Sequence, residues 1–276
     1  MQFEVLATDL DGTFIPLDGE HQSQNQRDLL EIDRELKRCN AQLVYVTGRH
    51  LDSVLEAMQQ YQLPQPAWIV CNVGTEIYRI DANTNASPLL TRAQFELSVG
   101  YARELRGLLG NWSVTSLWEA LTDVSGLRRQ EEAKQSEFKL SFYADMQHSE
   151  RLLKELQEIL DRQAAPFSLI SSQDPFTGDG LIDFLPQGVS KAYAVDWWAK
   201  SLGCNRDAII YAGDSGNDLA VFASGVRSIL VGNTEAGVVA QTRGIHAAQG
   251  WQNRLYHASN CATSGVLEGL QSFCAS

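Results

Sequence analysis

The sequence predicts an α/β fold, in which a doubly wound parallel sheet forms a core and an α+β cap domain is inserted into it. Three observations support this. Short apolar segments alternate with amphipathic helical segments up to residue 78, and the same alternation returns after residue 181. Between these regions the texture changes, and helices mix with strands. We therefore expect a core formed by residues 1–78 and 181–276, and a cap formed by residues 79–180.

The first core segment reads as strand, helix, strand, helix, strand, which is typical of right-handed crossovers in a parallel sheet. Short apolar runs give the strands, and apolar residues three or four apart give the helices. Prolines at 64 and 66 end the second helix. The expected elements are Phe3–Ala7, Gln24–Cys39, Gln42–Val46, Leu51–Tyr61 and Trp68–Cys71.

The pattern of the inserted region predicts two helices and two or more strands, with an ambiguous stretch over 112–135. No glycine- or serine-rich linker bounds it, which favours an insertion that returns to the main sheet over a tethered domain. The expected elements are a helix over Arg92–Leu109, a strand over Glu137–Tyr143, a helix over Ser149–Gln163 and a strand over Phe167–Ser172.

After the insertion, the strand Leu181–Leu185 is expected to bring the chain back to the core. A very apolar strand follows later and ends in a Gly-Asp-Ser-Gly-Asn-Asp run. The remaining expected elements are helices over Ser190–Leu202, Leu219–Ala223, Thr234–Thr242 and Thr263–Phe273, and strands over Ala208–Ala212 and Ser228–Val231.

Composition excludes several classes of protein. The 276 residues include 22 Lys and Arg against 34 Asp and Glu, so the net charge is −12. Such an acidic chain is a poor candidate for binding nucleic acid or an anionic membrane surface. The five cysteines are scattered without paired short spacing, which suggests neither a disulfide framework nor a zinc site. With no evident secretory signal or membrane-spanning stretch, we expect a reduced, soluble, cytoplasmic protein.

The first candidate site residues are Asp9 and Asp11, which follow the first strand and precede Gly12. In extended backbone, side chains two residues apart point to the same side, and Gly12 allows a sharp turn. Two adjacent carboxylates repel each other unless a cation lies between them. The alternative interpretation is a turn rich in Asp after a strand.

Other polar residues follow later strands or begin a helix: Thr47 and Gly48, Lys191, and the group Asp214, Asn217 and Asp218. In a doubly wound sheet, the carboxyl ends of the strands meet on one edge, which is where ligands bind. Each feature alone has a structural explanation, as a turn, a surface lysine or a capped loop. Their expected convergence is stronger evidence than any one of them.

The residue types suit phosphoryl transfer. Asp9 can attack phosphorus, and Asp11 can protonate the leaving alcohol and then activate water. Asp9 and Asp214, together with Asp11, are the predicted ligands of Mg²⁺. Thr47, Gly48, Lys191 and Asn217 are the predicted phosphate-binding residues. Asp218 is predicted to orient Lys191 or Asn217 rather than to bind the metal.

At these residues the chain resembles the haloacid dehalogenase superfamily. The resemblance lies in Asp-Leu-Asp-Gly-Thr at 9–13, Thr-Gly-Arg at 47–49, Lys191 and Gly-Asp-Ser-Gly-Asn-Asp at 213–218. The segments at 73–78, 183–186 and 263–269 are further similar to the sucrose-phosphate phosphatase family. The resemblance implies Mg²⁺, an aspartyl-phosphate intermediate and a disaccharide phosphate held between cap and core. In the cap it extends weakly over 138–142 and the strand before Asp174.

The resulting functional hypothesis is a Mg²⁺-dependent phosphatase of a sugar phosphate, with sucrose 6-phosphate first. The alternatives are a phosphatase of mannosylfructose phosphate or another glycosyl phosphate of osmolyte synthesis, a phosphomutase, and a non-catalytic sugar-phosphate-binding partner of the synthase. Lys139 and Asp183 are candidate sugar contacts. A solvated strand face explains Lys139 equally well.

Overall fold

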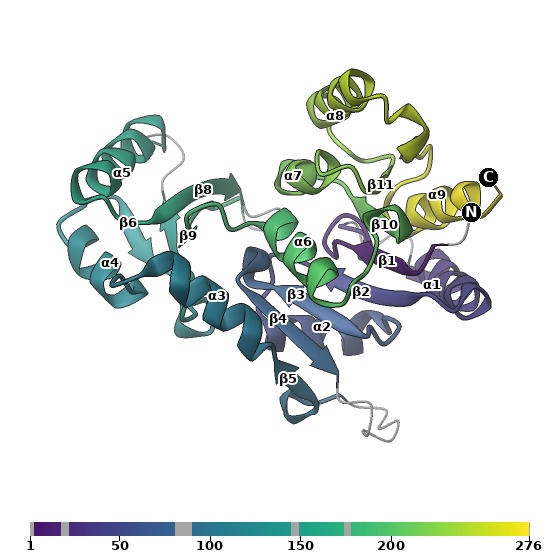
Figure 1. The fold of residues 1–276 in the computed structure, drawn as a ribbon, viewed down its shortest axis with the longest axis horizontal. Coiled ribbons are helices and arrows are strands. Elements are labelled where there is room, and N and C mark those ends of the chain that lie inside the picture. The colour runs from purple at the N-terminus through teal and green to yellow at the C-terminus, as the bar shows by residue number, and fades with distance from the viewer. Residues whose placement is uncertain (1–2, 18–21, 81–89, 145–148, 174–177, 276) are drawn as a thin grey trace. The chain divides into compact units, whose positions relative to one another are not determined.

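The structure, a computed structural model, describes residues 3–17, 22–80, 90–144, 149–173 and 178–275 (Figure 1). The chain forms two compact units. The first consists of Met1–Leu97 with Lys191–Ser276, and the second of Ser98–Ser190.

The first unit is built on an eight-stranded sheet in the order β12-β11-β10-β1-β2-β3-β4-β5. All pairs from β12 to β3 are parallel, whereas β3 with β4 and β4 with β5 are antiparallel. The strands are β1 Val5–Thr8, β2 Gln42–Val46, β3 Trp68–Cys71, β4 Glu76–Ile80, β5 Phe95–Leu97, β10 Ile209–Gly213, β11 Arg227–Leu230 and β12 Leu255–His257. The α/β class predicted from strand–helix alternation is confirmed.

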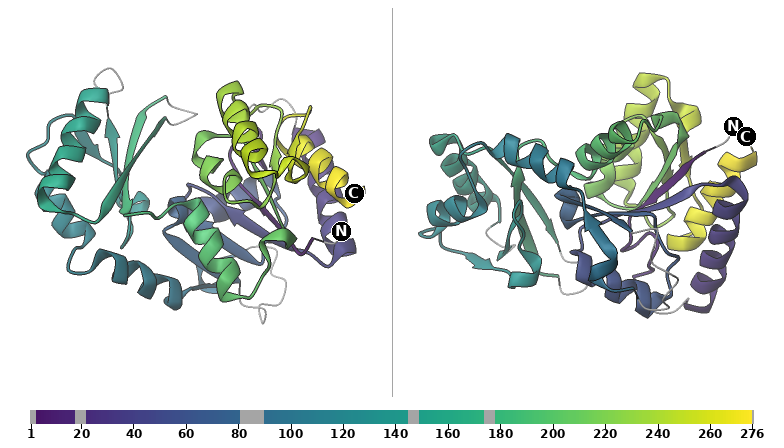
Figure 2. Two further views of the ribbon diagram at one scale, coloured as in Figure 1. Left: turned by 45° about the horizontal axis from the view of Figure 1, so that its top comes forward. Right: turned by 60° about the horizontal axis from the view of Figure 1, so that its bottom comes forward.

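Helices cover both faces of this sheet, because its strands are apolar on both sides. The helices are α1 Gln22–Cys39, α2 Leu51–Tyr61, α6 Lys191–Ser201, α7 Leu219–Phe222, α8 Ala236–Gln249 and α9 Ala262–Ala275, with short 3₁₀ turns η2 Asn72–Gly74, η3 Arg92–Gln94, η6 Arg206–Ala208, η7 Gly216–Asp218 and η8 Gln252–Arg254. Helices α1, α2 and α9 share one core cluster with Leu6 of β1 and Ile210 of β10. On the other face, Trp198 of α6 packs edge-on against Trp68 of β3. Helices α1 and α9 lie side by side (Figures 1 and 2).

The parallel arrangement brings the carboxyl ends of neighbouring strands to one edge. Thr8, the last residue of β1, lies beside Tyr45 of β2 and Ala212 of β10. The residues that directly follow these strands therefore start from the same edge of the sheet.

The second unit is a four-stranded antiparallel sheet in the order β6-β7-β9-β8 with helices packed on it. Its elements are α3 Val99–Leu109, α4 Val114–Leu121, β6 Leu127–Arg129, η4 Glu132–Lys134, β7 Leu140–Ala144, α5 Ser149–Gln163, β8 Phe167–Gln173 and β9 Gly180–Pro186. Leu105, Leu117, Phe142, Leu156 and Phe184 are buried in its core.

Two expectations about these boundaries are corrected. Leu181–Leu185 does not return to the main sheet but lies in β9, between β7 and β8. This strand is buried along nearly its whole length, as a strand of the main sheet would be. An apolar run in the sequence does not reveal which strand it pairs with. At the other boundary the main sheet extends past residue 78 to include β4 and β5.

The helix expected over Arg92–Leu109 is also shorter than predicted. Residues 95–97 form β5, which pairs with β4, and α3 begins only at Val99. The side chain of Ser98 accepts a hydrogen bond from the Tyr101 amide and so caps the helix there. Within the described residues, no helix is both long and apolar enough to cross a membrane.

Candidate active site

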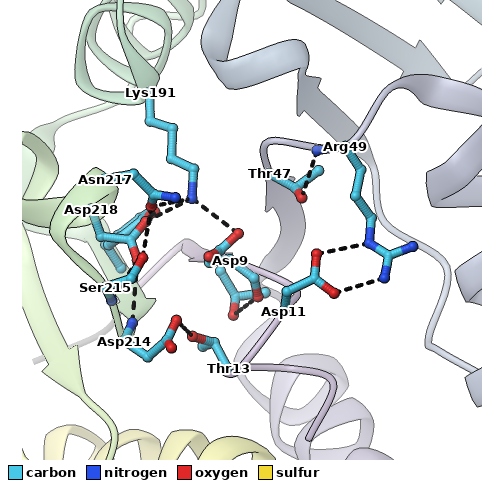
Figure 3. Close-up of polar contacts among 12 residues, drawn as sticks. Asp9, Asp11, Thr13, Thr47, Arg49, Lys191, Asp214, Ser215, Asn217 and Asp218 are labelled. Carbon is cyan, nitrogen blue, oxygen red and sulfur yellow. Dashed lines mark hydrogen bonds and ion pairs between the residues drawn. The ribbon is translucent and has the colours of Figure 1, made fainter. Parts of the chain in front are cut away.

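Asp9 lies at the centre of the candidate site, directly after β1 (Figure 3). Its amide donates a hydrogen bond to the Ala212 carbonyl at 2.9 Å, which continues the pairing of β1 with β10. Its side chain is almost fully buried, and one carboxylate oxygen lies 3.0 Å from Lys191 Nζ. Burial raises the pKa of Asp9 well above its ordinary value, and the Lys191 ammonium only partly opposes this.

Lys191 is the first residue of α6, and its side chain is fully buried. Besides Asp9, its ammonium donates to Asn217 Oδ1 at 2.9 Å and to Asp218 Oδ1 at 2.8 Å. Burial alone would lower the pKa of Lys191, but the Asp218 and Asp9 carboxylates raise it above its ordinary value. A fixed positive charge therefore lies beside Asp9.

Asp218 stabilises the loop that follows β10 through hydrogen bonds. It accepts a hydrogen bond from the Tyr211 hydroxyl at 2.6 Å, and its second oxygen lies 3.2 Å from the amides of Asp214 and Ser215. A side chain at Gly213 would meet this carboxylate at 2.6 Å, so only glycine fits there. Asp218 thus both contacts Lys191 and shapes the loop that carries Asp214.

Asp214 is held from both sides. The Thr13 hydroxyl donates to Asp214 Oδ1 at 3.0 Å, and Asn233 Nδ2 lies 3.5 Å from Oδ2. Gly12 has φ +77°, and a Cβ there would lie 2.3 Å from Asp214 Oδ2. The loop after β1 therefore packs directly on this carboxylate. Burial, followed by repulsion from Asp218, raises the pKa of Asp214 to about 6.

Three carboxylates form a candidate metal centre. Oxygens of Asp9, Asp214 and Asp218 lie within 4.8 Å of one another. This donor set of hard oxygens fits Mg²⁺, and the raised pKa values of Asp9 and Asp214 reflect crowded, buried carboxylates that a cation would relieve. Of the predicted ligands, Asp9 and Asp214 lie in this cluster.

The carboxylate of Asp11 does not lie in this cluster, and its role as a metal ligand stays a prediction. Instead, Arg49 binds both of its oxygens, with Nε 2.8 Å from Oδ2 and Nη2 2.7 Å from Oδ1 (Figure 3). An arginine fork matches a carboxylate in this way better than any other side chain. This pair turns the Asp11 side chain toward the loop after β2.

The loop after β2 carries Thr47 and Gly48. Thr47 is fully buried, and its hydroxyl oxygen accepts a hydrogen bond from the Arg49 amide at 3.2 Å. A Cβ at Gly48 would approach protein atoms only to 3.9 Å, at Val73. The fold itself therefore does not require glycine there, which leaves room for a ligand to approach the backbone.

A strained turn supports that loop. Asn72, Val73 and Gly74 all have positive φ, at 50°, 59° and 93°. This conformation is costly for a β-branched residue such as Val73. The amides of Asn72 and Val73 donate to the carbonyls of Arg49 and Thr47. Such strain at the edge of a cluster of charged groups is typical of functional sites.

The two candidate sugar contacts, Lys139 and Asp183, lie in the second unit. Both are buried, and Asp183 accepts a short hydrogen bond from the Ser141 hydroxyl across the β7–β9 pair.

Sequence reasoning missed four residues that organise the site: Thr13, Arg49, Tyr211 and Asn233. Arg49 belongs to the Thr-Gly-Arg segment, but its partner Asp11 lies 38 residues away. Thr13 adjoins Gly12, and Tyr211 is the polar-tipped residue of an apolar strand. Asn233 gives no local signal.

Comparisons with known proteins find similar sequences over almost the whole chain. A family model described as sucrose-6F-phosphate phosphohydrolase matches residues 2–274. A putative HAD-like hydrolase of Nitrosococcus oceani is 31% identical over 279 residues, which cover 98% of this chain and 71% of that protein. The mannosylfructose-phosphate phosphatase of Agrobacterium fabrum is 26% identical over 270 residues, covering 97% and 95%.

The fold is also found among solved structures. The crystal structure of the sucrose-phosphatase from Synechocystis sp. PCC6803 in complex with sucrose and phosphate superposes with a TM-score of 0.76. The alignment covers 99% of each chain at 24% identity.

Proposed function

The chain belongs to the sucrose-6F-phosphate phosphohydrolase family within the haloacid dehalogenase superfamily and is a phosphoric monoester hydrolase; on this premise we propose that it is a Mg²⁺-dependent phosphatase that hydrolyses sucrose 6-phosphate to sucrose and phosphate. The observation that carries the proposal is the buried group of Asp9, Asp214 and Asp218 with Lys191 against it. One carboxylate, one cation and a hard-metal donor set are the components that phosphoryl transfer requires.

In the proposed mechanism, a carboxylate oxygen of Asp9 attacks phosphorus and displaces the sugar alcohol, forming an aspartyl phosphate. Asp11 gives a proton to the leaving oxygen, and it then takes one from the water that releases phosphate. Bound Mg²⁺, held by Asp9 and Asp214, would supply positive charge to the phosphoryl oxygens. Lys191 supports the same charge from a fixed, buried position.

Four residues are proposed to bind the phosphoryl group: Thr47, Gly48, Lys191 and Asn217. Asn217 is held by the ammonium of Lys191 and by the Ser215 hydroxyl, each at 2.9 Å. Asp218 is proposed to orient Lys191, because it contacts that ammonium and is itself satisfied by Tyr211 and backbone amides. These roles concern only phosphate and metal.

Recognition of the sugar is therefore assigned to other residues. We propose that Lys139 and Asp183 contact it, because both are buried polar residues on adjacent segments of the second unit. A lysine and a carboxylate can together donate to and accept from sugar hydroxyls.

A second candidate substrate is mannosylfructose phosphate. The relative from A. fabrum that carries this name covers 97% of the chain at 26% identity, a likeness of similar size to that with the sucrose-phosphatase structure. Other glycosyl phosphates of osmolyte synthesis fit the same site. Association with the synthase that makes the phosphorylated sugar remains a prediction.

The test is phosphate release in the presence of Mg²⁺ from sucrose 6-phosphate, mannosylfructose phosphate, glucosylglycerol phosphate and glucose 6-phosphate. We expect the highest kcat/KM on sucrose 6-phosphate and no turnover in EDTA. A preference for another sugar phosphate would change the substrate but keep the chemistry. Absence of Mg²⁺-dependent turnover on every compound would contradict the proposed activity.

The sugar contacts have their own test. Replacing Lys139 by Met or Asp183 by Asn should raise KM for the disaccharide phosphate. Turnover of a small phosphate ester such as para-nitrophenyl phosphate, which lacks the sugar, should change little. Equal effects on both substrates would point to a structural role for these residues.

A further inference from the structure

A second group of metal-binding side chains lies outside the Asp9 site, where α1 and α9 run side by side. It consists of Glu35 and Cys39 in the last two turns of α1 and Cys274 in the last turn of α9. One carboxylate oxygen and the two sulfur atoms all lie within 4.8 Å of one another. None of these residues takes part in the proposed reaction.

We propose that Glu35, Cys39 and Cys274 bind a thiophilic divalent cation of the zinc and cadmium class. Thiolates and carboxylates are both ligands of such ions, and water can supply the fourth ligand. The set differs from the all-oxygen cluster at Asp9, which suits a hard cation. The two centres therefore select different metals.

The spacing on α1 suits chelation. Glu35 and Cys39 are four residues apart, so their side chains lie on the same face of the helix, one turn from each other. Cys274 completes the set from the neighbouring helix, and α1 and α9 are in direct contact. Closing these donors on one ion needs only side-chain adjustment, because they are already near one another.

The environment balances the charge of such a site. Two thiolates, one carboxylate and a divalent cation sum to −1, and the guanidinium of Arg38 supplies the compensating charge. Arg38 already binds Glu35 Oε2 through Nη2 at 2.6 Å and Nε at 3.0 Å. Glu35 retains its other carboxylate oxygen for a metal, as in the hydrogen-bonded carboxylate ligands of known metal sites.

The side chains of Cys39 and Cys274 are partly exposed to solvent and also pack against the protein core. All three residues are partly buried, and both cysteines pack against the apolar core of the first unit. Burial, and then the neighbouring Cys39, raises the pKa of the Cys274 thiol above its ordinary value. Since the thiolate is the form of cysteine that binds such an ion, protons compete with the ion at the sulfur atoms.

The expected consequence is a cross-link between two helices that are distant in sequence. A bound ion would join α1 to α9 and would stabilise the folded chain by an amount that rises with the logarithm of the ion concentration over its dissociation constant. The scattered spacing of the cysteines predicts no zinc site from sequence. The site becomes visible only when the fold brings residues 39 and 274 together.

The test is a titration of the full chain, reduced with a phosphine rather than a thiol, with Cd²⁺. We expect the ultraviolet charge-transfer band of cadmium–thiolate to saturate at one ion per chain, and the thermal unfolding midpoint to rise. Replacing Cys39 or Cys274 by Ser should abolish both effects. Replacing Glu35 by Gln should weaken them.

Two matched controls separate this site from other metal effects. Replacing the exposed Cys261 by Ser should leave the cadmium–thiolate band unchanged, because that thiol is not part of the group formed by Glu35, Cys39 and Cys274. Asp214→Asn should also keep it, because the oxygen cluster gives no thiolate band. A band that survives in both Cys39→Ser and Cys274→Ser, or no band in the reduced wild-type chain, would overturn the proposal.

Discussion

Arg49 donates two parallel hydrogen bonds, of 2.7 and 2.8 Å, to the Asp11 carboxylate. The arginine is itself held by the Ser53 hydroxyl at 3.0 Å, and both members of the pair are less than one quarter exposed. The orientation of the proposed acid–base residue is therefore set by α2 and the loop before it. Arg49 therefore links the loop that carries Thr47 to the side chain of Asp11.

The first prediction concerns this pair. Arg49→Lys keeps the charge but loses the fork, and we expect kcat to fall about tenfold. Arg49→Met removes the partner, and we expect kcat to fall on the order of 100-fold, as for a misplaced acid–base group. KM should change little, because Arg49 acts through Asp11. Steady-state kinetics measure both values.

Arg34→Lys and Arg34→Met are the matched controls, since Arg34 forms an exposed pair with Glu31 on α1. Both should leave kcat unchanged. If Arg49→Met retained wild-type kcat, the arginine would not position Asp11 for catalysis.

The second prediction concerns the turn after Asp11. A methyl group at Gly12 would lie 2.3 Å from Asp214 Oδ2, in a backbone conformation that alanine rarely adopts. Gly12→Ala should therefore displace Asp214, abolish Mg²⁺-dependent turnover and lower the free energy of unfolding by about 1–3 kcal/mol.

Gly237→Ala is the control for that substitution. Gly237 lies in α8, and a methyl group added there would have no neighbouring atom within 4 Å. Alanine there should leave activity intact and stabilise the helix by roughly 0.5–1 kcal/mol. Full activity of Gly12→Ala would show that the loop can move away from Asp214 at no cost.

The third prediction follows from the raised pKa of Asp214. Folding raises this pKa from 3.8 to about 6, so the folded state binds the proton more tightly than the unfolded state. The favourable contribution is complete below pH ~4 and is lost as pH rises through ~6. For metal-free protein, the loss is on the order of 3 kcal/mol.

Urea unfolding in EDTA between pH 4 and 7 measures this effect. Asp214→Asn should remove part of the decline in stability, whereas the exposed Asp52→Asn should not. In the wild type, Mg²⁺ should restore stability above pH ~6, and its apparent affinity should fall below that pH because protons compete for the carboxylate. Identical pH profiles for wild type and Asp214→Asn would contradict the assignment.

The fourth prediction concerns Asn233, which joins three segments. Its Nδ2 donates to the Gly12 carbonyl at 2.8 Å, and its Oδ1 accepts from the Ala262 amide at 2.8 Å. With Nδ2 also 3.5 Å from Asp214 Oδ2, it fixes the carboxylate relative to α9. Asn233→Ala should raise the Mg²⁺ concentration for half-maximal activity about tenfold.

At saturating Mg²⁺, the KM of Asn233→Ala for the sugar phosphate should remain near the wild-type value. Asn205→Ala is the control, because that side chain accepts one backbone hydrogen bond, from the Asp207 amide, before the amino end of β10, whereas Asp214 follows the carboxyl end of that strand. An unchanged Mg²⁺ requirement in Asn233→Ala would reduce Asn233 to a structural hydrogen bond.

The sequence predicted the parallel part of the core because its strands are short apolar runs separated by amphipathic helices. Gln42–Val46 and Trp68–Cys71 match β2 and β3 residue for residue. The antiparallel extension by β4 and β5 escaped prediction, because Phe95–Leu97 is too short to show a period of two. The strand β9 was placed in the wrong sheet, since burial does not reveal partners.

The candidate site was predictable where its residues follow a strand end or begin a helix. Asp9, Asp214, Asn217 and Asp218 follow strands of the main sheet, and Lys191 begins α6 and contacts Asp9, Asn217 and Asp218. The direction of the Asp11 side chain was not predictable, because it depends on Arg49, which is brought near only by the fold. The same holds for Cys39 and Cys274.

The most direct test of the account is to trap the covalent intermediate. Protein quenched in acid during Mg²⁺-dependent turnover of sucrose 6-phosphate, then digested and mapped by mass spectrometry, should carry one phosphoryl group on Asp9. Asp9→Asn should carry none and should be inactive. A phosphoryl group on another residue, or appreciable turnover by Asp9→Asn, would contradict the role of Asp9 as the nucleophile.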